Sequence, residues 1–209
     1  MREVVLQMHM TLDGCADSKT GFVPINDRAY WKELYEALRD TGASNVDTIL
    51  LGKGTYQQFV GFWPKVASDP SAPEDWRDQA RSLHETAKIV FSRTLKKADW
   101  QKTTIVRGGL DREIARLKRL RGANMLVPGG VAFPRALIER DLVDEYLLSV
   151  VPIILGQGRD RLFGPLERPR NLTAVRTRTF DNGVVLHQYR RIRGRGGMTF
   201  TPPSVVVDG

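Results

Sequence analysis

The sequence predicts one α/β domain with a mainly parallel sheet that ends in an antiparallel hairpin. Short apolar runs alternate with helix-like patterns through the middle of the chain, which is typical of parallel strands joined by helices. Near the end, two alternating runs flank Asp181-Asn182-Gly183, and an Asn-Gly pair between such runs indicates a hairpin. The 209 residues, 41% of them hydrophobic and 27% charged, are typical of a single soluble domain with its own core.

Eight segments are expected to form strands, because each is short and rich in apolar or β-branched residues. In chain order, they are Glu3–Met10, Val46–Leu51, Lys88–Ser92, Thr103–Val106, Asn124–Val127, Asp144–Leu155, Leu172–Phe180 and Val184–Ile192.

The helices are expected between these strands. Asp27 is the expected N-cap of the first helix. Three prolines, at positions 64, 70 and 73, predict a loop over Gly61–Asp75. Residues 193–209 combine glycines and prolines with a valine run, and we interpret them as a flexible C-terminal extension of a domain that spans 1–192. The expected helices are Arg28–Leu38, a short one from the GKGTY segment to about Phe59, Trp76–Thr86, Leu110–Leu120 and Ala132–Glu139.

Composition narrows the class of protein. The single cysteine, Cys15, excludes an intramolecular disulfide, and with no apolar leader this indicates the cytoplasm. No apolar stretch approaches the length of a membrane span. The net charge of +8 comes partly from two basic clusters that we interpret as solvated faces, and the lack of interleaved aromatic residues argues against nucleic acid as a partner. The three histidines share no metal-ligand spacing, so no metal is expected.

Two strands run into glycines where a helix is expected to begin. In VPGGVAF, Gly129 and Gly130 allow a ligand to approach the backbone closely. In LGKGTY, Gly52 precedes Lys53 and Thr55, which offer a charge and a hydroxyl beside the first-turn amides. Each segment alone is explained equally well by a tight turn or a helix start.

A third strand, in VFSRTL, ends in Ser92 and Arg93, a pair suited to a phosphate monoester or to an ordinary solvated loop. In an open α/β sheet, ligands lie outside the carboxyl ends of the strands. Three such ends together predict a ligand with several phosphates, and NADP fits that count. The glycine fingerprint of Rossmann folds and the Walker motif are absent.

Asp13 follows the first strand in the segment TLDG. It is a candidate for orienting a substrate or for donating a proton, although an aspartate beside glycine is also typical of a turn.

Five motifs occur here in an order that resembles a known family. The motifs are TLDG, LGKGTYQQF followed by FWP, VFSRTL, VPGGVAFPRAL and LVDEYLLSVVPIILGQGRDRLF. Together they resemble the reductase domain of bacterial bifunctional riboflavin-biosynthesis deaminase-reductases. More closely, they resemble the stand-alone proteins of that dihydrofolate reductase-like family. The resemblance covers residues 4–192 and implies a dihydrofolate reductase-like fold with a central mixed sheet flanked by helices and NADPH laid across the strand ends.

The resemblance also implies roles for the matching residues. Ser92 and Arg93 match positions that hold the 2′-phosphate, and Asp13 matches an aspartate near the substrate end. The remaining matches concern the pyrophosphate and its neighbouring phosphate, and they are Gly52, Lys53, Thr55, Gly129 and Gly130. Lysine at position 53 replaces the usual arginine, which keeps the charge but loses the bidentate fork.

Two departures limit the resemblance. One cysteine cannot build the zinc signature of the deaminase domain, so this chain is not a complete riboflavin enzyme. The first helix shows no obvious substitute for the buried carboxylate of dihydrofolate reductases, since Leu34 and Leu38 hold the inward face beside Glu33 and Glu36. This argues against folate as the substrate.

The sequence therefore predicts an NADPH-dependent reductase that transfers hydride to a carbonyl or imine carbon of a small pteridine-like, ribosyl-aminopyrimidine-like or other substrate. Trp31 and Phe163 are expected to line the pocket, and both fit a core position equally well. The alternative is a nucleotide-binding protein of the same fold without catalysis. The family resemblance implies a homodimer, with the strand over Asp144–Leu155 at the interface. A bulky residue at Gly130 is expected to weaken NADPH binding more than folding.

Overall fold

The computed structural model describes residues 1–16, 27–156 and 160–192. The C-terminal extension predicted over 193–209 lies outside these residues. Within the described ranges, no helix is long and apolar enough to cross a membrane.

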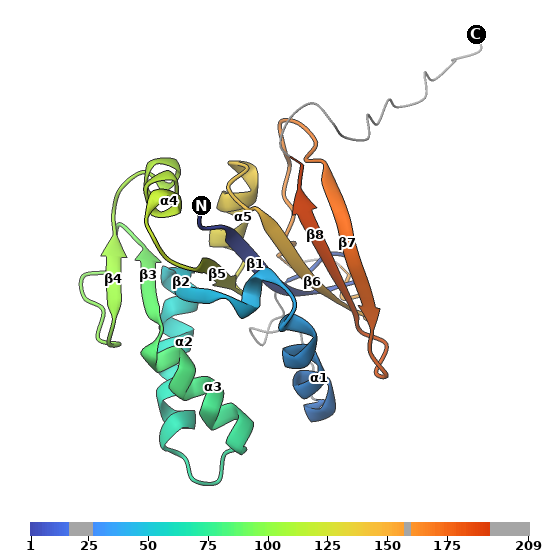
Figure 1. The fold of residues 1–209 in the computed structure, drawn as a ribbon, viewed down its shortest axis with the longest axis horizontal. Helices are drawn as coiled ribbons and strands as arrows, with labels where there is room; N and C mark the ends of the chain where they lie inside the picture. Colours follow the sequence, from blue (N-terminus) through green and yellow to red (C-terminus); the bar gives the residue numbers. More distant parts are fainter. Residues whose placement is uncertain (17–26, 157–159, 193–209) are drawn as a thin grey trace, which may run out of the picture.

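One eight-stranded sheet organises the described part of the chain, in the order β4-β3-β2-β5-β1-β6-β8-β7. The strands from β4 to β6 in this order are parallel, whereas β8 pairs antiparallel with β6 and β7 pairs antiparallel with β8 (Figure 1). The strands are β1 (Val4–Thr11), β2 (Val46–Gly52), β3 (Ala87–Phe91), β4 (Thr103–Val106), β5 (Asn124–Pro128), β6 (Glu145–Val151), β7 (Leu172–Thr179) and β8 (Val185–Arg191).

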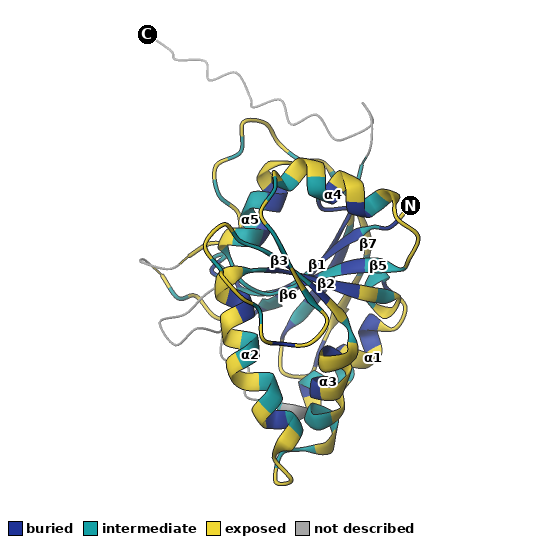
Figure 2. Ribbon diagram, turned by 90° about the vertical axis from the view of Figure 1, so that its left-hand side faces the viewer, coloured by how far each residue is buried: buried dark blue, intermediate teal, exposed yellow. Residues whose placement is uncertain are grey.

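Helices cover both faces of the sheet, because the strands alternate buried side chains between them (Figures 1 and 2). On β1, Val4 and Leu6 pack with α4 and α5, whereas Val5 packs with α1. A third cluster joins β2 and β3 to α2 and α3. The helices are α1 (Arg28–Leu38), α2 (Lys53–Ser68), α3 (Glu74–Glu85), α4 (Leu110–Arg119) and α5 (Ala132–Glu139), with a short 3₁₀ turn at Gly42–Ser44.

The α/β class and the mostly parallel sheet with antiparallel C-terminal strands are confirmed. Asp27 caps α1 as predicted, since its carboxylate accepts a hydrogen bond from the Tyr30 amide at 3.2 Å.

The predicted loop over Gly61–Asp75 is wrong in its first half, because α2 continues through Pro64 to Ser68. Proline removes one backbone hydrogen bond. Aromatic packing offsets that loss: Phe62 lies against both Trp63 and Trp76, with ring centroids 5.1 and 6.2 Å away.

The predicted dimer strand lies inside the sheet. β6 pairs with β1 on one side and β8 on the other, and six of its seven residues are buried. A strand with both neighbours in place has no backbone groups left to extend the sheet into another subunit, so an interface at β6 could form only through side chains. The homodimer itself stays a prediction. The strands at the two edges are β4 and β7.

Candidate functional site

The carboxyl ends of the parallel strands meet at one edge of the sheet, where the three predicted phosphate segments come together. Lys53, directly after β2, donates a hydrogen bond from Nζ to Oγ1 of Thr94, which follows β3, at 3.1 Å. The first turn of α5 lies at the same place, because a Cβ on Gly52 would lie 2.8 Å from the Cβ of Phe133. Phe133 in turn stacks on Phe91 at the end of β3, with ring centroids 5.1 Å apart.

Two helices begin at this edge with their first-turn amides free of side-chain caps. α2 has Gly52 as N-cap and α5 has Val131; neither makes a side-chain cap hydrogen bond, and neither helix has an acidic residue in its first turn. α4 begins here too, but Asp111 and Glu113 supply negative charge in its own first turn. Helix amides with a partial positive charge and no internal anion favour an external one.

The two glycines after β5 differ in their surroundings. Gly129 has φ +73°, and a Cβ there would meet nothing within 4 Å, so its backbone faces open space. Gly130 has φ +80°, and a Cβ there would overlap the hydroxyl of Thr55, which is 9% exposed. Gly130 is therefore needed for packing between the β5–α5 turn and α2. The expectation that a bulky residue at Gly130 weakens NADPH binding more than folding stays a prediction, and a side chain there would also displace the Thr55 hydroxyl.

Ser92 and Arg93 lie in the turn after β3. The Ser92 hydroxyl accepts hydrogen bonds from the amides of Thr94 at 3.2 Å and Leu95 at 2.9 Å. These use its two acceptor sites, so the hydroxyl hydrogen remains to be donated to an anion. The guanidinium of Arg93 is exposed and joins none of the hydrogen bonds or ion pairs among the described residues.

The end of β4 also lies at this edge, and no site residue was predicted there. Arg107, Gly108 and Gly109 follow β4, and Arg107 donates from Nη2 to the carbonyl of Leu95 at 2.8 Å. This places a second arginine beside the turn that carries Arg93. The sequence contained a signal, since a Gly-Gly pair between a strand and a helix also marks the β5–α5 turn.

Asp13 links the turn after β1 to the segment after β6 through hydrogen bonds. Its carboxylate accepts hydrogen bonds from the Thr11 hydroxyl at 2.6 Å and from the amides of Leu155 at 3.3 Å and Gly156 at 3.0 Å. The Thr11 hydrogen bond above all holds the pKa of Asp13 well below its usual range. An ionised carboxylate is no proton donor at neutral pH, so this geometry favours the turn interpretation.

A cluster of polar and aromatic side chains lies under α1, near the end of β1. His9 Nε2 is 3.0 Å from the hydroxyl of Tyr30, and the His9 ring is 4.9 Å from that of Trp31. Burial lowers the pKa of His9 to about 4, so its imidazole is neutral at pH 7. His9 was not predicted as a site residue, although a polar side chain in a buried alternating strand is a recognisable signal. Phe163 is 39% exposed.

Neither Glu33 nor Glu36 belongs to the buried side of α1. Leu34, Ala37 and Leu38 form the buried side of the helix, as predicted. Glu33 instead forms an ion pair with Arg178 on β7, at 3.2 Å.

The fold is of the reductase type, and sequence comparison identifies the family. The sequence profile of the RibD C-terminal domain family matches residues 2–186, so the chain belongs to that family. It is 32% identical over 185 residues to the uncharacterized protein YyaP of Bacillus subtilis, covering 88% of this chain and 92% of YyaP. It is 28% identical over 193 residues to YwjB of the same organism, covering 90% and 98%.

Solved structures share the fold. A putative riboflavin biosynthesis protein from Shewanella sp. PV-4 has a TM-score of 0.65 at 24% identity, covering 92% of this chain and all of that one. A pyrimidine reductase-like protein from Corynebacterium diphtheriae has 0.62 at 16%, covering 92% and 93%. Dihydrofolate reductase from Enterococcus faecalis, complexed with NADP(H) and RAB-propyl, has a TM-score of 0.57 at 13% identity, covering 90% of this chain and 96% of that one. The dihydrofolate reductase-like fold is thereby confirmed.

Proposed function

We propose that the protein is an NADPH-dependent reductase that transfers hydride to a carbonyl or imine carbon of a small substrate. One observation carries the proposal: the uncapped, acid-free N-termini of α2 and α5 lie side by side at the carboxyl edge of the sheet. Two adjacent anion sites match the two phosphates of a pyrophosphate.

The residues at this edge fit the rest of the cofactor. Gly129 leaves open space for a pyrophosphate to approach the backbone, and Lys53 and the first turn of α2, which includes Thr55, supply a charge and amides. Ser92 retains a hydroxyl hydrogen and Arg93 an unpaired guanidinium, which together suit the additional 2′-phosphate. Among the related structures, the dihydrofolate reductase was solved with NADP(H).

The substrate is proposed to lie near the end of β1, beside Trp31 and the neutral His9. Bound NADPH supplies the hydride, while the chain contributes orientation and exclusion of water. Asp13 holds the loops at this end in place through its hydrogen bonds. Phe163 remains a proposed second wall. A small pteridine or ribosyl-aminopyrimidine is the substrate class we favour, because the protein from C. diphtheriae is described as pyrimidine reductase-like.

Binding and turnover test the proposal separately. Calorimetry should show NADPH binding, and the absorbance of NADPH should fall steadily with at least one member of a panel of small aldehydes, pteridines and ribosyl-aminopyrimidines. Tight binding without turnover on any of them would favour the alternative, a nucleotide-binding protein without catalysis. If NADPH does not bind at all, both functions are excluded.

Cofactor choice is tested with Arg93→Ala. We expect the dissociation constant of NADPH to rise about tenfold and that of NADH to change less than about twofold, because only NADPH carries the 2′-phosphate. Arg81→Ala, which removes an exposed arginine on α3, is the matched control. Equal losses for the two nucleotides would refute the placement of Arg93.

A further inference from the structure

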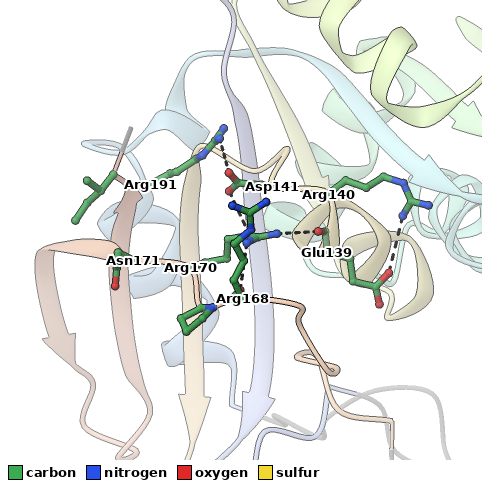
Figure 3. A pocket seen from close by; sticks show the side chains of 9 residues that line it. Glu139, Arg140, Asp141, Arg168, Arg170, Asn171 and Arg191 are labelled. Atoms are coloured by element: carbon green, nitrogen blue, oxygen red, sulfur yellow. Dashed lines mark hydrogen bonds and ion pairs between the residues drawn. The ribbon is translucent and has the colours of Figure 1, made fainter. Parts of the chain in front are cut away.

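A second pocket lies at the opposite edge of the sheet from the candidate nucleotide site. It has a volume of about 490 Å³ and is formed where α5 ends, β7 begins and β8 ends (Figure 3). Because β8 runs antiparallel to β6, with Arg190 opposite Glu145, these ends gather at the amino edge of the parallel strands. The volume is typical of small-ligand pockets. The lining residues are Glu139, Arg140, Asp141, Arg168, Pro169, Arg170, Asn171, Arg191 and Ile192.

Positive charge dominates this pocket. Four of its lining residues are arginines and two are acids, which leaves an excess of two positive charges. The guanidinium of Arg168 joins none of the hydrogen bonds or ion pairs found in the described part of the chain. Arg191 pairs with Asp141, and Arg170 Nε lies 3.7 Å from the same carboxylate. One aspartate thus serves two arginines while a third remains without a counter-ion.

Two guanidinium groups in the pocket are incompletely hydrogen-bonded. Arg170 uses Nη1 and Nη2 to bind the carbonyls of Arg168 at 3.1 Å and Glu139 at 3.0 Å. The Nε atoms of Arg170 and Arg191 are buried and have no hydrogen-bond acceptor among the described residues. A buried charged donor without an acceptor costs free energy, so an anion that supplies oxygen atoms here is favoured.

Backbone contacts fix the arrangement of these charges. Asp141 has φ +56° directly after α5, a conformation that aspartate and asparagine tolerate better than other residues. Its amide donates to the carbonyl of Ile138 at 3.0 Å, and the Leu142 amide donates to that of Leu137 at 2.9 Å. The side chain of Arg170 is held by the two carbonyls described above. The guanidinium groups of Arg170 and Arg191 therefore meet at Asp141, whereas that of Arg140 points away from it, as Figure 3 shows.

We propose that this pocket binds a small anion that carries a phosphate group, through Arg168, Arg170 and Arg191. Guanidinium groups match the oxygens of phosphate with paired hydrogen bonds. Asp141 is the internal counter-ion that the ligand partly replaces. The site is separate from the proposed NADPH site and does not depend on it.

The test uses pyrophosphate as the probe in isothermal titration calorimetry, with sodium chloride adjusted to constant ionic strength. All proteins carry Lys53→Ala and Arg93→Ala, so that binding at the opposite edge is weakened to the same extent in every protein compared. In this background, Arg168→Gln removes a cation that joins no hydrogen bond or ion pair among the described residues. Asp141→Asn removes the competing carboxylate while keeping a residue that tolerates positive φ. The ion pair Arg81–Asp78 on α3 provides matched controls, Arg81→Gln and Asp78→Asn, with the same changes of charge.

The two pocket variants should move affinity in opposite directions. We expect Arg168→Gln to weaken pyrophosphate binding about threefold and Asp141→Asn to strengthen it about threefold, the size of one partly exposed ion pair. The α3 controls should remain within about 1.5-fold. The proposal is overturned if pyrophosphate does not bind, if the pocket variants match the α3 controls, or if a single-stranded oligonucleotide displaces pyrophosphate at lower concentration than pyrophosphate itself binds.

Discussion

At the scale of single residues, His9 is the group with the clearest consequence for pH dependence. It lies in the central strand β1 beneath Trp31, and Tyr30 binds its Nε2. Burial lowers its pKa from 6.5 to about 4 in the folded protein. Between these values the unfolded chain binds a proton that the folded chain does not, so the free energy of unfolding falls as the pH falls.

We predict that this residue alone reduces the free energy of unfolding by about 1.5 kcal/mol between pH 6.5 and pH 5. His9→Gln keeps a hydrogen-bonding side chain but removes the titration, so its stability should change less over that interval. Urea unfolding of both proteins at several pH values measures the difference, and the carboxylates that titrate in both cancel. Parallel stability profiles would contradict the buried, neutral state of His9.

The residues at the strand ends could be identified from the sequence, but the contacts that each of them makes could not. Gly129 and Gly130 are adjacent and both have positive φ. Only the three-dimensional arrangement shows that Thr55, seventy-five positions before Gly130, fills the space beside one of them and leaves the other open. Likewise, the donors that bind Asp13 come partly from Leu155 and Gly156, which no local pattern connects to it.

At the scale of elements, the β5–α5 turn offers a sharp test of the cofactor proposal. Gly129 and Gly183 have φ values of +73° and +81°, and a Cβ on either would meet no atom closer than 3.4 Å. Gly129 faces the proposed pyrophosphate, whereas Gly183 lies in the β7–β8 hairpin turn. Substituting alanine therefore imposes the same backbone strain at two places, only one of which is proposed to approach a ligand.

We predict that Gly129→Ala and Gly183→Ala each lower the free energy of unfolding by about 1–2 kcal/mol. Only Gly129→Ala should also weaken NADPH binding, by about tenfold, because its methyl group occupies the space of the pyrophosphate. Urea unfolding and calorimetric titration with NADPH provide the two measurements. Unchanged NADPH affinity in Gly129→Ala would remove this turn from the cofactor site.

The bounds of helices and strands were predicted correctly where the local sequence pattern and the tertiary packing favour the same structure. The strand over Thr103–Val106 and the helix over Ala132–Glu139 have the predicted bounds. Prediction failed at Pro64, where aromatic packing against α3 outweighs local propensity. The sequence also did not indicate that Lys88, which is buried in β3, caps the C-terminus of α3. Its ammonium donates hydrogen bonds to the carbonyls of Leu83 at 2.8 Å and Thr86 at 2.7 Å.

At the scale of the whole molecule, the two proposed binding sites lie at opposite ends of the parallel strands. The carboxyl ends of the parallel strands gather the proposed NADPH residues, and the amino edge gathers the arginine pocket. The order of the strands was not predictable, because β6 and β1 are separated by more than a hundred residues and nothing local specifies that they pair. This is why a strand with the apolar character of an interface proved to be central to the sheet.

Hydrogen exchange measured with and without NADPH tests this separation over the whole molecule. We expect NADPH to slow exchange at the amides of 53–56 and 129–133, because these first-turn and turn amides would bind phosphate oxygens. The edge strand β7, whose side chains are mostly exposed, should exchange at the same rate in both states. In the Gly129→Ala protein, at an NADPH concentration that saturates only the original sequence, the slowing should decrease in both segments together, since one pyrophosphate is proposed to join them. Slowing in β7 equal to that in α2 would indicate general stabilisation and would count against a ligand held at one edge of the sheet.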